Sequence, residues 1–159
     1  MRRRVAVLMG GRSSEHEVSL ASAAAVMAAL DPDRDEVIPV LIAPDGVWSV
    51  EGEPVAMVAG ADGVGCLTSL AGGPARAVDV VFPVLHGPHG EDGTIQGALE
   101  TAGVPYVGAG VAASALAMDK ALFKVFLRAA GIPTPEHCTV TVDEWAGDPE
   151  GARGRRRAR

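Results

Sequence analysis

The chain has 159 residues, of which 48% are hydrophobic and 21% charged, and its formal net charge is -6. These values indicate one globular domain, or one domain and the start of a second, with enough residues to bury a core. They argue against nucleic acid as the main partner, and no apolar run approaches the ~20 residues of a membrane span. The two cysteines, Cys66 and Cys138, are far apart with no CxxC pattern, which favours a reducing compartment and a cytoplasmic protein.

The first quarter of the chain predicts a strand followed by a helix. Val5–Met9 is a short apolar run that a glycine pair ends, as expected for a buried parallel strand. The stretch SSEHEVSLASAAAVMAAL has small apolar residues at helical spacing, and Ser14 with Glu17 fits a capping box. Asp31-Pro32 is expected to stop this helix.

A second strand and a turn follow. Glu36–Ile42 predicts a strand, and the turn signal PDG lets Val47–Val50 pair back across it. Gly60–Arg76 is rich in glycine and alanine and is predicted to be a loop. Val78–Leu85 reads as another buried strand.

The remaining elements continue the alternation of strands and helices. A helix is predicted at Thr94–Ala102, with Ile95 and Leu99 on its buried face, and a longer one at Ala112–Ala130. The other expected elements are short strands at Pro105–Val107 and His137–Val142 and a turn of helix at VDEW. Repeated βα units of this kind predict an α/β fold with a parallel sheet and helices on its faces.

Two loops are predicted to meet at one edge of that sheet. GGRSSEHE follows the first strand and HGPHGEDG follows the strand Val78–Leu85, so both leave the carboxyl ends of strands. Glycines allow a close approach to a ligand, and helix N-termini attract anions. A carboxylate such as Glu15 would instead bind an ammonium group. Together they suggest a small zwitterion as the ligand.

Other interpretations of these residues remain open at this point. Glu15 could complement the dipole of its helix, and His86 could be a hydrogen-bonded residue at a strand end. Asp92 could be the N-cap of the next helix. A metal site built from His86, His89, Glu91 and Asp92 is disfavoured, because loop glycines scatter the side chains and no cysteine or distant histidine completes it. The chain contains neither GxGxxG nor GxxxxGK[ST]. Lys120, Lys124 and Arg128 fit a solvated helix face.

Three segments resemble the amino-terminal part of D-alanine–D-alanine ligases, which belong to the ATP-grasp superfamily. They are VAVLMGGRSSEHEVSLASAAAV, LHGPHGEDGTIQGALETAGVPYVGAGVAASALAMDK and AGIPTP, in order and correctly spaced between Val5 and Pro135. The resemblance implies an enzyme that joins two D-alanines for peptidoglycan synthesis. In that family ATP phosphorylates the carboxylate of the first D-alanine, and the amine of the second attacks the acyl phosphate.

The resemblance also implies roles for four residues. Glu15 matches the glutamate that holds the ammonium group of the first D-alanine, and Val18 matches a residue near its methyl group. His86 matches the histidine beside its carboxylate, where the acyl phosphate forms. Lys120 matches a lysine that contacts ATP phosphate. Glu15 and His86 are thus the expected catalytic residues, and Lys120 is the expected cofactor-binding residue.

The implied architecture is a Rossmann-like (pre-ATP-grasp) amino-terminal domain at residues 1–108 and the start of an ATP-grasp central domain at 109–152. The magnesium ligands and the second ATP lysine of the family are missing from this sequence, so the chain alone is expected to be inactive. D-alanine and ATP are the expected small-molecule partners, with a homodimer for the full-length family and with neither nucleic acid nor membrane. The alternative is a non-catalytic α/β domain that binds a small ligand.

Residues 153–159 form a basic tail with no counterpart in the resembled family. No apolar residue larger than alanine occurs there, so the tail is expected to be disordered. An accidental shift of reading frame is favoured over an evolved segment for binding nucleic acid or anionic membrane.

Overall fold

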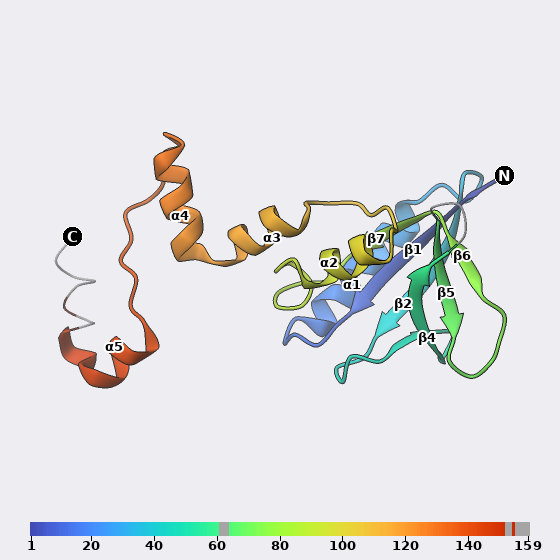
Figure 1. The fold of residues 1–159 in the computed structure, drawn as a ribbon, viewed down its shortest axis with the longest axis horizontal. Coiled ribbons are helices and arrows are strands. Elements are labelled where there is room, and N and C mark those ends of the chain that lie inside the picture. Colours follow the sequence, from blue (N-terminus) through green and yellow to red (C-terminus); the bar gives the residue numbers. More distant parts are fainter. Residues whose placement is uncertain (61–63, 152–153, 155–159) are drawn as a thin grey trace. The chain divides into compact units, whose positions relative to one another are not determined.

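The computed structural model describes residues 1–60, 64–151 and 154, which form two compact units, Met1–Met118 and Asp119–Arg159 (Figure 1). Among the described residues, the strands all belong to the first unit: β1 (Arg3–Gly10), β2 (Asp35–Ile42), β3 (Trp48–Val50), β4 (Glu53–Ala59), β5 (Gly65–Ser69), β6 (Arg76–Val78) and β7 (Val80–Pro83). Its helices are α1 (His16–Ala29), α2 (Thr94–Thr101) and α3 (Val111–Met118). The second unit contains α4 (Lys120–Ala129) and α5 (Val142–Gly147). The predicted boundary after residue 108 therefore lies about one helix before the division between the units.

The strands form one mixed sheet in the order β6-β5-β4-β3-β2-β1-β7. β1 pairs in parallel with β2 on one side and with β7 on the other. The four strands beyond β2 are joined by antiparallel pairings. The α/β class predicted from the sequence is confirmed, and the predicted parallel sheet corresponds to the half made of β2, β1 and β7.

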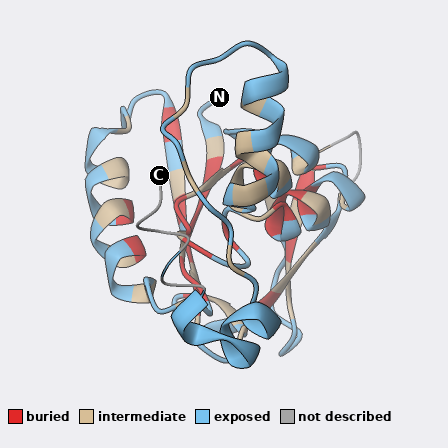
Figure 2. Ribbon diagram, turned by 90° about the vertical axis from the view of Figure 1, so that its left-hand side faces the viewer, coloured by how far each residue is buried: buried red, intermediate tan, exposed pale blue. Residues whose placement is uncertain are grey.

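The two long crossovers of the parallel half cover opposite faces of the sheet. Along β1, Val5 and Val7 pack in one core cluster with Ala23 of α1. The alternate residues Ala6 and Leu8 belong to the second cluster, which contains Ile95 and Leu99 of α2. Since successive side chains of a strand point to opposite faces, α1 and α2 lie on opposite faces of the sheet. β1 is thereby buried on both sides, as its unbroken apolar run predicted (Figure 2).

The antiparallel half corrects one prediction. Gly60–Arg76 was expected to be a loop, but it contains β5 and the first residue of β6, and β4 also forms before it. Leu67 of β5 is buried in the same cluster as Leu8, so tertiary packing overrides the weak local signal of the glycines. The predicted return of the chain across the PDG turn is confirmed, because Leu41 pairs with Ser49.

The single strand predicted at Val78–Leu85 is divided. Val78 ends β6 and Val80 begins β7, with Asp79 between the two strands. Asp79 accepts hydrogen bonds from the backbone and side chain of Arg4, at 2.7 and 3.0 Å to Oδ2. These hydrogen bonds fix Asp79 to β1 at the point where the chain passes from β6, in the antiparallel half, to β7, in the parallel half. The strand predicted at Pro105–Val107 is reduced to one parallel bridge, between Val81 and Tyr106.

Two helix starts differ from the predictions. The helix α1 has Glu15 as its N-cap and no side-chain cap, so the capping box of Ser14 and Glu17 is wrong. The predicted helix Ala112–Ala130 is broken at Asp119, whose Oδ1 accepts hydrogen bonds from the first turn of α4. Aspartate is a strong N-cap residue, and here it starts a new helix inside an otherwise helical pattern.

The second unit has little buried surface. None of the residues of α4 is buried, and its apolar side chains Leu122, Val125 and Phe126 are exposed. Residues 132–140 lack regular structure, so the strand predicted at His137–Val142 is wrong, whereas the predicted helical turn at VDEW is confirmed as α5. The predicted disordered tail lies outside the described residues except for Gly154. Within the described part of the chain, no helix is long and apolar enough to cross a membrane.

Candidate functional site

The site lies at the carboxyl ends of β1 and β7, where the chain leaves adjacent strands in opposite directions. After β1 it enters α1 on one face of the sheet, and after β7 it enters α2 on the other face. Such a switch point opens a crevice between the two loops, and ligands of open α/β sheets bind there. The sequence prediction that GGRSSEHE and HGPHGEDG meet at one edge is therefore correct.

Ser13 joins the two loops. Its hydroxyl donates a hydrogen bond of 2.7 Å to the backbone oxygen of His86 and accepts one of 3.1 Å from the backbone N–H of Glu15. The single hydroxyl thus fixes the backbone at both predicted site residues. Sequence analysis did not single out Ser13, because a serine in a glycine-rich loop has many ordinary uses.

Glu15 lies at the start of α1 with its carboxylate next to the second loop. A Cβ atom placed on Gly87 would collide with Glu15 Oε2, so the carboxylate lies directly against the backbone of the second loop. The side chain is exposed and makes no cap hydrogen bond. Nor does any other residue in the described part of the chain form a hydrogen bond or ion pair with the Glu15 carboxylate. The carboxylate therefore does not cap the helix by a hydrogen bond, although its N-cap position also suits the alternative role of complementing the helix dipole.

His86 is half-buried, and its ring is held by α1. Ser22 Oγ lies 3.2 Å from His86 Nε2 and 2.9 Å from the backbone oxygen of Val18, to which it donates. Because a serine hydroxyl has only one proton to donate, it accepts the proton of Nε2–H. The other ring nitrogen, Nδ1, has no hydrogen-bond partner among the residues that the structure describes. His86 thus has one ring nitrogen fixed and one available.

Val18 lies between Glu15 and Ser22 on one face of α1, at helical spacings of three and four residues. Its side chain is 55% exposed, which leaves a small apolar surface beside the carboxylate and the imidazole. The structure therefore brings Glu15, Val18 and His86 together. Ser22 was missed by sequence analysis, although its position one turn beyond Val18 on the same face was a usable signal.

The acids of the second loop hold that loop in shape. Glu91 Oε2 accepts a hydrogen bond of 2.8 Å from Gly87 N, and Asp92 accepts from His89 N and Thr94 N at 2.9 and 3.0 Å. Burial alone would raise the pKa of Asp92, but these hydrogen bonds outweigh it and lower the pKa. The N-cap of α2 is Gly93, so the prediction of Asp92 as N-cap is off by one residue.

No metal site forms from these residues. Within the described ranges, no group of three or more histidine, cysteine, aspartate or glutamate side chains has a geometry that could hold a metal ion. Glu91 and Asp92 are instead hydrogen-bonded to backbone N–H groups of their own loop.

Lys120, the predicted ATP contact, belongs to the second unit, where it is exposed at the start of α4. The two other basic residues of its stripe contact the segment that follows the helix. Lys124 Nζ lies 3.4 Å from the backbone oxygen of Pro135, and an Arg128 guanidinium nitrogen lies 3.4 Å from His137 Nδ1. The structure thus gives these two residues a local role in addition to solvation.

Comparison with known proteins assigns the chain to a family. A family model described as the D-ala D-ala ligase N-terminus matches residues 4–109. The D-alanine–D-alanine ligase of Mycolicibacterium vanbaalenii is 52% identical over 158 residues, covering 84% of this chain and 43% of that protein. That of Geobacillus kaustophilus is 42% identical and covers 91% of this chain and 44% of its own length.

Solved structures agree with this assignment. The D-alanine–D-alanine ligase from Coxiella burnetii has a TM-score of 0.85 at 34% identity and covers 97% of this chain and 48% of that one. The VanG D-Ala:D-Ser ligase from Enterococcus faecalis has a TM-score of 0.74 at 32% identity, over 97% of this chain and 49% of that one. The chain spans about half the length of the relatives that it matches. With its residues 4–109 matching the amino-terminal domain, the chain belongs to the D-alanine–D-alanine ligase family.

Proposed function

We propose that this chain supplies the part of a D-alanine–D-alanine ligase that binds the first D-alanine, in an ATP-dependent reaction that joins two D-alanines through an acyl phosphate. The relatives' names support the reaction, and the crevice between the β1 and β7 loops supports the place. The observation that carries the proposal is the unengaged Glu15 carboxylate, which lies beside a half-buried histidine at a sheet switch point.

Glu15 binds the ammonium group of the substrate in this proposal. An ammonium in the crevice would form a charge-assisted hydrogen bond with the carboxylate, of about 1.5–3 kcal/mol where water is excluded. Val18 is close by on the same helix face and offers the apolar surface that a methyl group requires. The site thus distinguishes the two substituents of an α-amino acid by their chemistry.

His86 positions the substrate carboxylate, which is the group that becomes the acyl phosphate. With Nε2 fixed by Ser22, the protonated ring would donate from Nδ1 toward an anionic oxygen. A fixed donor of this kind stabilises negative charge without reorganising as the reaction proceeds. Ser13 holds the His86 backbone at a fixed position relative to Glu15. The distance between the group that would bind the substrate ammonium and the group that would bind its carboxylate is therefore constrained.

Lys120 is proposed to contact ATP phosphate, where a positive charge offsets the charge of the transferring group. Magnesium supplies further neutralisation in the proposed reaction, but the described residues contain no cluster that fits it, so we assign no ligand to it here. Peptidoglycan synthesis, a cytoplasmic location and a homodimer are the corresponding cellular proposals. The alternative is a binding domain without catalysis.

A chimeric enzyme tests the proposal. Met1–Met118 replaces the matching segment of the M. vanbaalenii ligase, and D-alanyl-D-alanine formation is measured with D-alanine or L-alanine as substrate. We expect ATP-dependent dipeptide formation with D-alanine but not with L-alanine, and a large loss of turnover for His86→Ala. A control chimera carries the G. kaustophilus segment through the same junction. If the control chimera is active while this one folds, binds ATP and makes no dipeptide, the chain is a binding domain without catalysis.

A further inference from the structure

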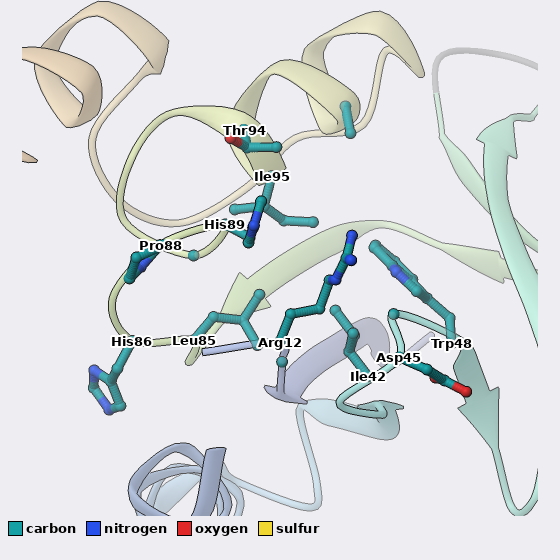
Figure 3. A pocket seen from close by; sticks show the side chains of 14 residues that line it. Arg12, Ile42, Asp45, Trp48, Leu85, His86, Pro88, His89, Thr94 and Ile95 are labelled. Carbon is teal, nitrogen blue, oxygen red and sulfur yellow. The ribbon is translucent and has the colours of Figure 1, made fainter. Parts of the chain in front are cut away.

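A cavity lies at the same edge of the sheet as Glu15, on the face covered by α2. Its volume is about 310 Å³, near the lower end of the range for small-molecule sites. It is bounded by the turn between β2 and β3, the loops that follow β1 and β7, and the start of α2. Glu15 and Val18 do not line it, and Figure 3 shows the ring of His86 directed away from it.

The base of this cavity is apolar. Ile42, Leu85 and Ile95 line it and are each at least 90% buried, so they are firmly held by the core beneath. The indole of Trp48 forms one side wall, and Ala98 on α2 leaves space where a longer side chain would fill it. A flat or branched apolar group of modest size fits such a lining, because burying it removes apolar surface from water on both partners.

Arg12 extends into the same cavity. Figure 3 shows its guanidinium directed toward the Trp48 ring and away from the sheet end. Gly46 is close to the stem of this arginine, since a Cβ there would lie 3.2 Å from Arg12 Cδ. Throughout the described ranges, no carboxylate lies within ion-pair distance of the Arg12 guanidinium. The cavity thus combines an apolar base with an arginine whose charge is not neutralised.

The one acid that lines the cavity is directed elsewhere. Asp45 Oδ1 accepts a hydrogen bond of 2.9 Å from Val47 N, which holds the carboxylate in the β2–β3 turn. Figure 3 shows its carboxylate directed away from the Arg12 guanidinium. His89, exposed at the other rim, adds a second group that can donate hydrogen bonds. The polar groups that face the opening are therefore suited to an anion.

We propose that this cavity is a second ligand site, which takes a small organic anion with an apolar aromatic body. The body lies over Ile42, Leu85 and Ile95 against Trp48, and its carboxylate, sulfonate or phosphate binds Arg12 as a charge-assisted pair. The site is separate from the proposed D-alanine crevice, and it is independent of whether the chain takes part in ligation. The two sites share the GGRSSEHE loop, which carries Arg12 and Glu15, and the HGPHGEDG loop, which carries His86, so occupation of one is able to alter the other.

NMR of the tryptophan indoles tests this proposal with 2-naphthoate as the probe. The chain has two tryptophans, so the Trp48 N–H signal reports on the cavity while that of Trp145, in the other unit, serves as an internal reference. We expect a saturable shift of the Trp48 signal alone. The neutral isostere 2-naphthylmethanol should bind about tenfold more weakly, because it lacks the charge-assisted pair with Arg12.

Two variants and a control make the result decisive. Arg12→Ala should weaken 2-naphthoate binding about tenfold, and Ala98→Leu should abolish it by filling the cavity. Arg34→Ala, an exposed arginine at the start of β2 and so at the far edge of the sheet, should leave it unchanged. The amide spectrum of each variant shows that it is folded. An unmoved Trp48 signal, equal binding of the neutral isostere, or undiminished binding by folded Ala98→Leu would each overturn the proposal.

Discussion

The two halves of the sheet are built differently, and the difference explains where the candidate site lies. In the parallel half, Val5, Ala6, Val7 and Leu8 of β1 are each at most 2% exposed, because helices cover both faces. In the antiparallel half, Leu67 is buried but Val58 is 40% exposed. Both loops of the Glu15 crevice leave strands of the parallel, fully covered half. The antiparallel half extends the core and supplies the Trp48 wall of the Arg12 cavity.

Matched glycine substitutions should give the largest difference between the halves. Gly10 and Gly72 both have φ of +86°. A Cβ on Gly10 would lie 2.5 Å from Ile42 O and 2.8 Å from His16 Cε1, whereas one on Gly72 would meet nothing within 4 Å. We expect Gly72→Ala to lower the free energy of unfolding by about 1 kcal/mol through its backbone alone, and Gly10→Ala by about 3 kcal/mol or more.

Urea denaturation of both variants measures this difference directly. The wild-type chain and Gly52→Ala, another glycine at positive φ with open space around it, are the controls. If Gly10→Ala and Gly72→Ala lower the free energy of unfolding equally, the close contacts predicted around a Cβ at Gly10 carry no cost, and the expected difference between the halves is contradicted.

Two serines provide the next comparison. Ser19 of α1 is fully buried, and its hydroxyl accepts a hydrogen bond from Gly10 N and donates one to Val84 O. Ser19→Ala leaves both backbone groups unsatisfied and should cost about 2–3 kcal/mol. Ser69 in the antiparallel half accepts a single bond of 3.2 Å from the exposed Ala71 N, so Ser69→Ala should cost about 0.5 kcal/mol. Chemical denaturation that ranks the two in the opposite order would contradict the account.

The smallest expected effect concerns ion pairs and pH. Hydrogen bonds from the side chain and then the backbone of Arg4 lower the pKa of Asp79 to about 2, from an ordinary value of 3.8. A lowered folded-state pKa stabilises the fold above the unfolded-state pKa, and this stabilisation is lost as the pH falls through the folded-state value. The wild-type melting temperature should therefore fall between about pH 4 and pH 2, and Asp79→Asn should remove that part of the fall.

The matched control for Asp79 is Glu51, whose pair with Arg76 lies within the antiparallel half. Glu51 and Arg76 have side chains that are 72% and 44% exposed, so solvent screens their attraction. Glu51→Gln should leave the melting temperature unchanged across the same pH range. If the pH dependence of the melting temperature changes in Glu51→Gln but not in Asp79→Asn, the acid-sensitive ion pair is Glu51–Arg76, and the role given to Asp79 is contradicted.

The parallel half could be predicted from the sequence because its signals are local and redundant. Val5–Met9 is apolar without interruption, and Ile95 and Leu99 are spaced as one helix face, which is also how they are buried. The strand β5 gave no such signal, since Gly65 and Thr68 interrupt its apolar residues, and what stabilises it is its pairing with β4 and β6 and the burial of Leu67. The break at Asp119 was hidden for a similar reason, because helical residues continue on both sides of it.

The residues of the candidate site likewise include some that the sequence could predict and some that it could not. Glu15, Val18 and His86 could be named from motif resemblance, and the structure brings them together. Ser13 could not, and the only sequence signal for Ser22 was its position on the same helix face as Val18. Both serines act through contacts across 73 and 64 residues that only the fold creates. The Arg12 cavity was also not foreseen, since its walls come from β2, β3, α2 and the loops after β1 and β7, which are separate in the sequence. Sequence identifies chemically distinctive residues more readily than it identifies the ordinary side chains that position them.

The most direct test of the central claim is the Michaelis constant for D-alanine of the chimeric ligase carrying Glu15→Gln. Loss of a carboxylate that binds an ammonium group should raise this constant about tenfold or more, while the variant stays folded. Glu17→Gln, an exposed acid in the first turn of the same helix, is the matched control and should change it less than about twofold. If Glu15→Gln behaves like Glu17→Gln, the carboxylate at the switch point does not bind the substrate and the proposed site is contradicted.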